Sequence, residues 1–263
     1  MAQLLDNSFF RRVSPGIDTL PCSFSLPRHR HLRPYATVVL AGTFEESGYN
    51  GRILATTGDV LIHPAMDCHA NQTVSAGVKL IRLDWPDTSV AGGLYHLDNI
   101  DELARTAESD VSAATLMLKI ALENKCLRST GQRNDWPDLL LDDLRKNTST
   151  EIGEWAEVNG LARATVSRRF GAAYGVTPSV LRAELRAREA WLRITRGSDR
   201  LCSIALDTGF ADQAHMTRWI ERISGAPPTA WRISPAKSRQ FNWSRGLVAG
   251  NRANDDAIRK LGK

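Results

Sequence analysis

A pattern of residues in the second half of the chain recurs at a spacing of about fifty positions, and no other sequence feature constrains the fold as strongly. The segment 154–161 aligns with 203–210, and the alignment continues downstream of both segments. The offset grows from 49 to 50 at the turn, so the second copy has one additional residue there. The matched pairs are Ala156 with Ala205, Gly160 with Gly209, Leu161 with Phe210, Val166 with Met216, Arg168 with Arg218, Gly175 with Gly225, Pro178 with Pro228 and Arg182 with Arg232.

Each matched residue type has a physical role in a helix-turn-helix unit. Two helices that cross at a wide angle need a small residue at the crossing, which Ala156 and Ala205 supply. The tight turn needs a residue that tolerates positive φ, which explains Gly160 and Gly209. The large apolar residue after each glycine then fills the space between the helices. The repeat therefore predicts two helix-turn-helix units.

The second helix of each predicted unit has one buried and one open face. Val166 and Phe170 are four residues apart, as are Met216 and Ile220, so each pair faces the core. Arginine can bond the guanine edge and glutamine the adenine edge in the major groove, while hydroxyls suit phosphates. The alternative is that these faces are merely solvated, but two copies in register disfavour it. The residues predicted to contact DNA are Arg163, Ala164, Ser167, Arg168, Gln213, Ala214, Thr217 and Arg218.

The uneven charge of the chain points to the same partner. The formal net charge of +5 divides into −3 over residues 1–150, +5 over 151–240 and +3 over 241–263. An acidic front and a basic back indicate a polyanion partner for the back alone.

The segment between the two copies has the pattern of a single helix over 179–196. Eighteen residues at 1.5 Å each form a rod of about 27 Å. With the offset of the recognition helices added, this approaches the roughly 34 Å of one DNA turn. One chain could therefore place two recognition helices in successive major grooves.

Residues 140–235 resemble the DNA-binding domain of the AraC/XylS family of bacterial transcription regulators. The resemblance implies a regulator that binds double-stranded DNA at an operator or promoter, with RNA polymerase as a further partner. It implies recognition helices over about 163–173 and 213–223, and the sequence departs from the family at Trp219-Ile220, where a small or polar residue and then phenylalanine are usual. The motifs that carry it are Ile204-Ala205, Gly209-Phe-Ala-Asp-Gln213, Arg218, Gly225-Ala-Pro-Pro228 and Trp231-Arg232, with Ala164–Phe170 and Tyr174–Pro178 in the first copy.

The front of the chain has a different character. Short apolar runs separated by turn residues fill 35–85, which predicts a small all-β barrel or sandwich. Residues 99–128 then have helical spacing, and 129–137, which ends in Trp136-Pro137, breaks this pattern and is typical of a linker or a turn. We predict an α+β multidomain chain with an N-terminal small β-barrel and helical segment before a C-terminal all-α double helix-turn-helix domain. The predicted parts are a cupin-like effector barrel at 1–98, a helical dimerisation or linker segment at 99–138, an AraC-type DNA-binding domain at 139–235 and a polar basic tail at 236–263.

The β-rich part is similar to the cupin-like barrels that family members often carry. His29-Arg-His31 resembles the start of the first cupin motif, with Gly42 near its closing glycine. The run Gly58–Pro64 followed by His69 resembles the second motif, with Met66 where glycine is expected. The resemblance implies that His29, His31 and His69 converge on an effector pocket.

The chemistry of that pocket stays open at this stage. The glutamate of metal-binding cupins is absent, with Tyr35 and Ala36 in its place, so we predict no metal and no cofactor. We take His63 as structural, and Cys68 as a buried inert thiol. Nearby arginines favour an anionic small-molecule effector, because arginine suits planar carboxylates. These are Arg28, Arg30 and Arg33.

Two functions follow from the two halves. The first is a transcription regulator controlled by a small molecule or by dimerisation. The second is a metal-dependent cupin enzyme fused to a DNA-binding domain, which the incomplete ligand set disfavours; we therefore predict no enzyme. An apolar stripe with Leu103, Leu116 and Leu118 either caps the barrel or forms a weak homodimer.

The remaining features suit a cytoplasmic protein. The four cysteines form no Cys-x-x-Cys pair and fit free thiols in a reducing compartment. Residues 1–10 lack the pattern of a signal peptide, and no apolar run approaches the length of a membrane span, so no membrane partner is expected.

Overall fold

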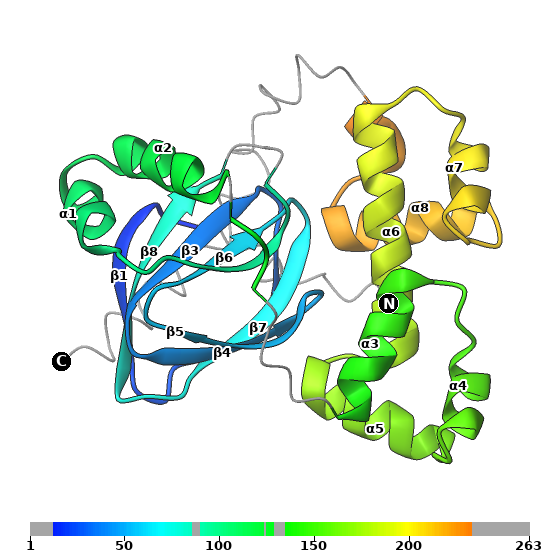
Figure 1. Ribbon diagram of the computed structural model, residues 1–263. Coiled ribbons are helices and arrows are strands. Elements are labelled where there is room, and N and C mark those ends of the chain that lie inside the picture. The colour runs from blue at the N-terminus through cyan, green and yellow to red at the C-terminus, as the bar shows by residue number, and fades with distance from the viewer. Residues whose placement is uncertain (1–12, 86–89, 124, 129–134, 233–263) are drawn as a thin grey trace, which may run out of the picture.

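Strands occupy the first part of the protein and helices the rest. The computed structural model describes residues 13–85, 90–123, 125–128 and 135–232. Within them, nine strands precede nine helices, and Figure 1 shows the strands packed on one side of the molecule and most of the helices on the other. The predicted tail at 236–263 and most of the predicted linker at 129–137 lie outside the described residues.

The strands form two antiparallel sheets. The five-stranded sheet has the order β1-β8-β3-β6-β9, and the four-stranded sheet has the order β2-β7-β4-β5. We expected a small barrel, but no strand pairing joins the two sheets among the described residues, so the unit is two facing sheets. The strands are β1 (Gly16–Pro21), β2 (Ser25–His31), β3 (Tyr35–Ala41), β4 (Thr43–Gly48), β5 (Gly51–Thr56), β6 (Asp59–His63), β7 (Asp67–Thr73), β8 (Gly77–Asp84) and β9 (Gly93–His96).

An apolar core fills one end of the space between the sheets. Side chains alternate across each strand, so every second residue of β4 and β5 faces inward, as Phe44, Ile53 and Ala55 do. They pack against Leu61 and Leu80 of the other sheet. The other end of this space holds polar side chains, described below.

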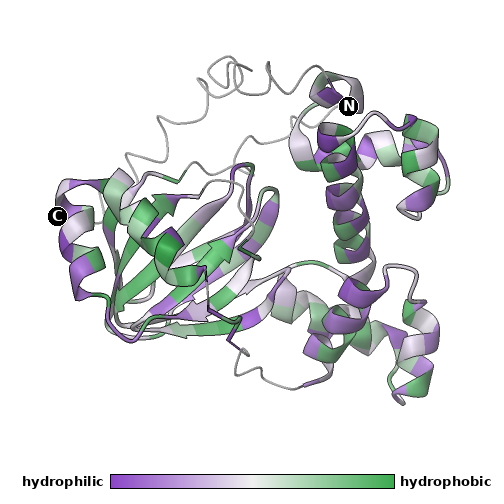
Figure 2. Cartoon of the chain, turned by 45° about the horizontal axis from the view of Figure 1, so that its top comes forward, coloured by the Kyte–Doolittle hydropathy of each residue, from purple (hydrophilic) through white to green (hydrophobic). Residues whose placement is uncertain are grey.

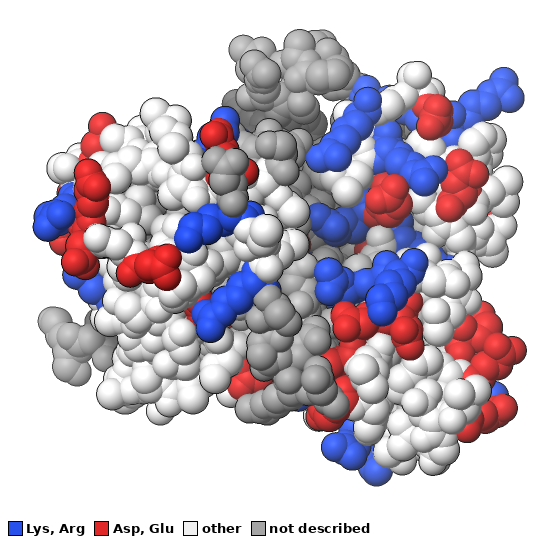
Figure 3. Space-filling view, in the orientation of Figure 1, with Lys and Arg blue, Asp and Glu red and all other residues white. Residues whose placement is uncertain are grey.

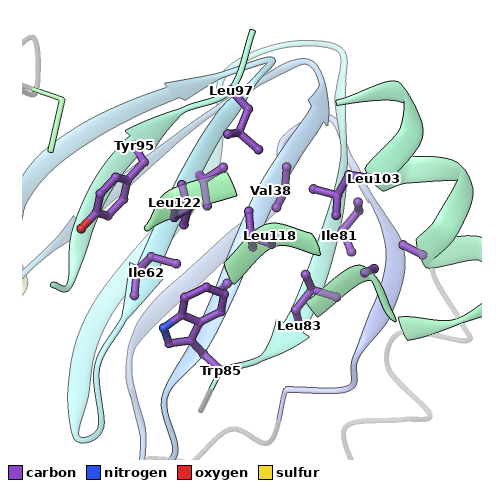
Figure 4. Close-up of a cluster of buried hydrophobic side chains, with 14 residues drawn as sticks. Val38, Ile62, Ile81, Leu83, Trp85, Tyr95, Leu97, Leu103, Leu118 and Leu122 are labelled. Carbon is purple, nitrogen blue, oxygen red and sulfur yellow. The ribbon is translucent and has the colours of Figure 1, made fainter. Parts of the chain in front are cut away.

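Two helices cover the outer face of the five-stranded sheet. They are α1 (Asp101–Ser109) and α2 (Val111–Leu122), which is capped by Asp110. Leu103 and Leu118 pack on Val38 and Ile81, as the close-up in Figure 4 shows. Of the stripe expected from the sequence, these two leucines cap the sheet, while Leu116 is 59% exposed on the other side of α2.

The helical part is built around one long helix. Figure 1 shows α6 between two helix pairs, α4 with α5 and α7 with α8. One apolar core joins α3, α5 and the start of α6, and a second joins the end of α6 to α7 and α8. Figure 2 shows purple and green alternating along these helices, as expected of helices with one buried face. The helices are α3 (Trp136–Lys146), α4 (Ile152–Val158), α5 (Arg163–Tyr174), α6 (Pro178–Arg196), α7 (Leu201–Asp207), α8 (Gln213–Ser224) and α9 (Pro228–Arg232).

Helix α3 begins before the expected start of the helical domain at residue 139. Its first residues are Trp136 and Pro137, and proline suits the first turn of a helix because its missing N–H is not needed there. The sequence Trp-Pro looked like a turn, but it starts this helix.

The loop between β6 and β7 joins the two halves. Met66 has φ of 62° and a fully buried side chain that packs among Ala187, Trp191 and other residues of the second helical core. Left-handed φ favours glycine, which is the residue expected here from the cupin motif. The loop therefore keeps the conformation that suits glycine while its side chain fills a gap beside α6. None of the helices in the described part of the chain is long and apolar enough to cross a membrane.

Candidate nucleic-acid interface and buried histidine cluster

The two helix pairs have matching turns. Residues 159–162 connect α4 to α5, and 208–212 connect α7 to α8, so the second turn is one residue longer, as the repeat predicts. Gly160 and Gly209 have φ of 64° and 78°, which explains why glycine stands at both positions. Ala156 and Ala205 are both fully buried where the helices meet.

Helices α5 and α8 begin differently and end alike. The side chain of Asp212 accepts a hydrogen bond from the backbone N–H of His215 at 2.6 Å, which caps α8. Helix α5 follows Ala162 and has no side-chain cap. Both helices end at a left-handed glycine, Gly175 or Gly225.

The buried and exposed faces of α5 and α8 agree with the sequence pattern. Val166, Phe170, Met216 and Ile220 are at most 1% exposed. Among the residues predicted to face DNA, six are exposed and the two hydroxyl residues are half-buried. The exposed ones are Arg163, Ala164, Arg168, Gln213, Ala214 and Arg218, and the half-buried ones are Ser167 and Thr217.

Two other arginines hold the repeat together. Arg182 donates to the backbone oxygen of Thr150 at 2.8 Å, and Arg232 donates to the backbone oxygen of Asp199. Each acceptor lies just before the first helix of its pair, so the two arginines perform the same structural role in the two copies.

The surface charge differs between the helix pairs. Figure 3 shows blue Lys and Arg side chains gathered over the upper helical region and red acidic side chains along the lower right edge. Arg163 of α5 contacts Glu157 at 3.1 Å, but both side chains are more than 70% exposed, so the pair contributes little.

A cluster of histidines lies between the sheets, at the end away from the apolar core. His29 and His31 are two residues apart on β2 and face the same side, and His69 on β7 is the cross-strand partner of His29. Ligand atoms of these three lie within 4.8 Å of one another, and each residue is at most 5% exposed. The structure therefore brings the three predicted histidines together.

Further polar side chains complete the cluster from both sheets. Asp67 Oδ2 accepts from His63 Nδ1 at 3.0 Å and from His69 Nδ1 at 2.9 Å. Tyr35 Oη lies 3.0 Å from His69 Nε2. Glu46 of β4 lies beside His63 and His69, with its oxygens 3.7 and 3.9 Å from their ring nitrogens.

The buried environment shifts the pKa values of this cluster. Burial, together with the neighbouring histidines, lowers the pKa of His31 to about 2, so its imidazole is neutral. Burial alone would raise the pKa of Asp67, but the hydrogen bonds from the two histidines hold it well below its ordinary value. Burial raises the pKa of the Tyr35 hydroxyl well above its ordinary value, so it stays protonated. Burial opposes protonation of His69, but the carboxylates of Glu46 and Asp67 raise its pKa above the ordinary value.

The sequence placed Arg28 and Arg30 beside the histidines of the pocket, but in the structure they face away from these histidines. They alternate with His29 and His31 on β2, so their side chains leave the opposite face of the sheet and reach helix α6. Arg28 Nη2 lies 2.5 Å from Glu184 Oε2, and Arg30 Nη2 lies 3.3 Å from Glu184 Oε1. The two arginines join the β-sheet unit to the helical unit.

The same network includes a tyrosine. Tyr49 Oη donates to Glu184 at 3.1 Å and accepts from Arg30 at 2.7 Å, and both guanidinium groups lie about 5.5 Å or less from its ring centre. Burial opposes ionisation of Glu184, but the two arginines hold its pKa below its ordinary value. Cys68 faces this side of β7, away from His69, and burial raises the pKa of its thiol to about 11. A thiol with this pKa is inert at neutral pH.

Comparison with known families decides the nature of the helical part. A family model described as a helix-turn-helix domain matches residues 155–234, which run from the second half of α4 through α9. The chain carries an AraC-type helix-turn-helix domain.

Solved structures similar to the chain include three regulators. The C-terminal domain of AraT, a response regulator from Geobacillus stearothermophilus, is 16% identical, with 38% of this chain and 87% of that chain covered and a TM-score of 0.36. An AraC-type regulator from Chromobacterium violaceum is 22% identical over 38% and 89% of the chains, with a TM-score of 0.34. ToxT from Vibrio cholerae is 8% identical over 83% and 97%, with a TM-score of 0.36. A search of curated proteins found no match.

The AraC-type domain departs from the family pattern at Trp219 and Ile220, and the structure accommodates both residues. Ile220 is fully buried, and Trp219 is half-buried and donates to His215 Nε2 at 3.1 Å. The matched residues begin inside α4, so α3 lies outside them, although its leucines share the core of α5.

Sequence reasoning missed two acidic residues that the structure makes important. Glu46 alternates with Phe44 and Gly48 on the inward side of β4, so strand periodicity could have placed it between the sheets. Glu184 lies three residues from both Leu181 and Ala187, which are buried in α6. An acidic residue at core spacing in a helix is the signal that could have identified it.

Proposed function

We propose that the protein is a DNA-binding transcription regulator that reads two successive major grooves, one with α5 and one with α8. The observation that carries this proposal is the repetition of one surface pattern in two helices. Each presents an exposed arginine at the same repeat position, Arg168 or Arg218, above a buried apolar face.

Helix α6 supports the two-groove arrangement. It has 19 residues and therefore a length of about 28 Å, which separates the two pairs by nearly one turn of B-DNA. Packing of both pairs on this one helix fixes their relative positions. Such preorganisation favours binding to two sites on one face of the duplex.

Single arginine substitutions test this proposal directly. The DNA site is first obtained by selection from random duplexes with the full chain. Arg168→Ala and Arg218→Ala are each expected to weaken binding to that site by about 1–3 kcal/mol, because each removes one contact to a base edge or phosphate. Fluorescence anisotropy at fixed ionic strength measures the change.

A matched control is Arg105→Ala, which removes an exposed arginine from α1 on the β-sheet unit. We expect it to leave DNA affinity unchanged. If selection enriches no sequence, the regulator proposal is wrong. If a site is found but neither Arg168 nor Arg218 affects affinity, α5 and α8 are not the reading helices.

We also propose that the histidine cluster holds the effector that controls the regulator. The cluster lies directly behind Arg28 and Arg30 on β2, and these two arginines contact α6 of the DNA-binding half. A ligand at His29 or His31 would therefore act one residue away from the contact between the halves.

The exposed side of α2 supports a weak homodimer. Leu116 and Ile120 are 59% and 60% exposed and lie four residues apart on one face of the helix. Sedimentation velocity of the full chain over a range of concentrations is expected to show a reversible dimer that Leu116→Glu abolishes. Lys119→Glu on the same helix is the control for added charge, and a monomer mass at all concentrations would contradict this proposal.

A further inference from the structure

We propose that Arg186 of α6 is the positioning residue that fixes the spacing between α5 and α8, because its guanidinium group bonds the backbone of both helix-turn-helix units at once. The first unit is α4 with α5, and the second is α7 with α8. This inference rests on the proposed two-groove function, since it names the residue that sets the distance between the two grooves. It gives Arg186 a role in the choice of DNA site without direct contact to a base.

Arg186 lies near the middle of α6 and reaches both units. Its Nη2 donates to the backbone oxygen of Thr148 at 2.5 Å, and its Nη1 donates to the backbone oxygen of Gly209 at 2.6 Å. Thr148 lies in the loop that leads into α4, and Gly209 lies in the turn between α7 and α8. The planar fork of one guanidinium group therefore joins the two units.

The turn of the second unit leaves room for this side chain. A Cβ atom added at Gly209 would lie 3.0 Å from the guanidinium carbon of Arg186, which is closer than an ordinary van der Waals contact. A Cβ atom added at Gly160, in the matching turn of the first unit, would meet no atom within 4 Å among the described residues. The close approach at Gly209 is therefore a departure from the repeat, and it places Arg186 against the turn that precedes α8.

The two units have separate apolar cores, and Arg186 lies at the boundary between them. Leu181 and Leu185 of α6 belong with the core of the first unit, and Ala187 begins the part of α6 that enters the core of the second. Each core holds its own unit on α6. The two hydrogen bonds of Arg186 add a direct link, which resists rotation of one unit relative to the other.

A neighbouring arginine makes the same type of contact within one unit. Arg182 lies one turn earlier on α6 and donates to the backbone oxygen of Thr150 at 2.8 Å, in the loop before α4. Burial and the positive charge of Arg182 lower the pKa of Arg186, so the two backbone oxygens compensate an unfavourable place for its charge. Because Arg182 holds the first unit and Arg186 holds both, comparison of the two separates local support from positioning.

A fixed spacing makes the number of base pairs between the half-sites part of the recognition. One base pair inserted between them moves the second half-site by about 3.4 Å along the duplex and by about 34° around it. Two rigidly joined units cannot follow both half-sites after this change, whereas two loosely joined units can. The effect of the insertion therefore reports on the link between the units, separately from the contacts to bases.

The test measures binding of the full chain to three duplexes by fluorescence anisotropy at fixed ionic strength. They are the selected site, the same site with one base pair inserted between its half-sites, and the site with one half-site scrambled. The wild-type chain is expected to bind the inserted duplex at least about 10-fold more weakly than the selected site.

Arg186→Met removes both hydrogen bonds and keeps a long side chain. It should bind the selected site about 10-fold more weakly than the wild type, because the preorganised spacing is lost. The inserted base pair should then weaken its binding by less than about 3-fold, because the units can adjust to the new spacing. Its affinity for the duplex with one scrambled half-site should equal that of the wild type.

Two further variants keep the comparison interpretable. Arg182→Met is the matched control, and it should retain the insertion penalty of the wild type because Arg186 still joins the units. Arg186→Lys keeps the charge but has one nitrogen in place of the fork, so its insertion penalty should lie between those of the wild type and Arg186→Met. Near-UV circular dichroism verifies that each variant is folded.

Three results would overturn the inference. The wild-type chain could tolerate the inserted base pair, which needs no variant to interpret. Folded Arg186→Met could keep the insertion penalty of the wild type. Arg186→Met could also lose affinity by the same factor on all three duplexes, as expected of a phosphate contact or of general support for the fold. A selection that enriches no sequence would instead contradict the regulator function itself, before any variant is compared.

Discussion

Glu184→Ala is expected to lower the free energy of unfolding by about 3–5 kcal/mol, because removal of one partner leaves buried charges without compensation. Arg28 and Arg30 both contact this carboxylate, and neither is more than 10% exposed in its side chain. Loss of Glu184 leaves two guanidinium groups in a protein interior. The cost therefore exceeds that of breaking an ordinary surface pair.

Urea unfolding monitored by tryptophan fluorescence measures this change. Glu189→Ala is the matched control on the same helix, because Glu189 pairs with Arg193 at 3.0 Å on the surface and is 53% exposed. Its loss should cost at most about 0.5 kcal/mol. If Glu184→Ala costs as little as Glu189→Ala, the network between β2 and α6 does not hold the two units together.

Phe170→Ala is expected to lower the free energy of unfolding by about 3–5 kcal/mol, because it opens a cavity beneath α5. Phe170 is fully buried, and its ring lies 4.7 Å from that of Tyr174 in the core shared by α3, α5 and α6. The second helix pair uses a separate core around Met216 and Ile220. The damage should therefore concentrate in the first pair, and affinity for the selected DNA should fall.

Hydrogen exchange followed by mass spectrometry locates the effect. Faster exchange is expected in α3, α4 and α5, with α8 protected as in the wild type. Val158→Ala is the control, because Val158 is 87% exposed at the end of α4 and its truncation should change stability by no more than about 0.5 kcal/mol. Uniform loss of protection in both helix pairs would show that the two cores form one cooperative unit.

The helical half could be predicted almost to the residue because local signals agree there. Glycine turns and apolar pairs four residues apart depend on neighbours in the chain, and helices α5, α6 and α8 lie where the sequence places them. The start of α3 was missed because Trp136-Pro137 reads as a turn without knowledge of the core that Leu140 enters.

The β-sheet half was predicted less well because its contacts join distant residues. Strand periodicity can show that Arg28 and His29 face opposite ways, but not that α6 covers the arginine side. The predicted pocket for an anionic effector assumed that residues adjacent in sequence share a site. The partners of the arginines and histidines, Glu184 and Glu46, lie far from them in sequence, and local reasoning could not pair them.

The alternating side chains of β2 connect the histidine cluster on one face of the strand to α6 on the other. His29 and His31 face the cluster between the sheets, while Arg28 and Arg30 contact α6, on which α5 and α8 pack. A ligand that favours one position of this strand would, through these ion pairs, also favour one position of α6. Linkage is reciprocal. An operator that prefers that position would therefore raise the affinity of the histidine cluster for its ligand by the same factor by which the ligand raises the affinity for the operator. DNA would then act on the histidine cluster, just as a ligand of that cluster would act on DNA binding.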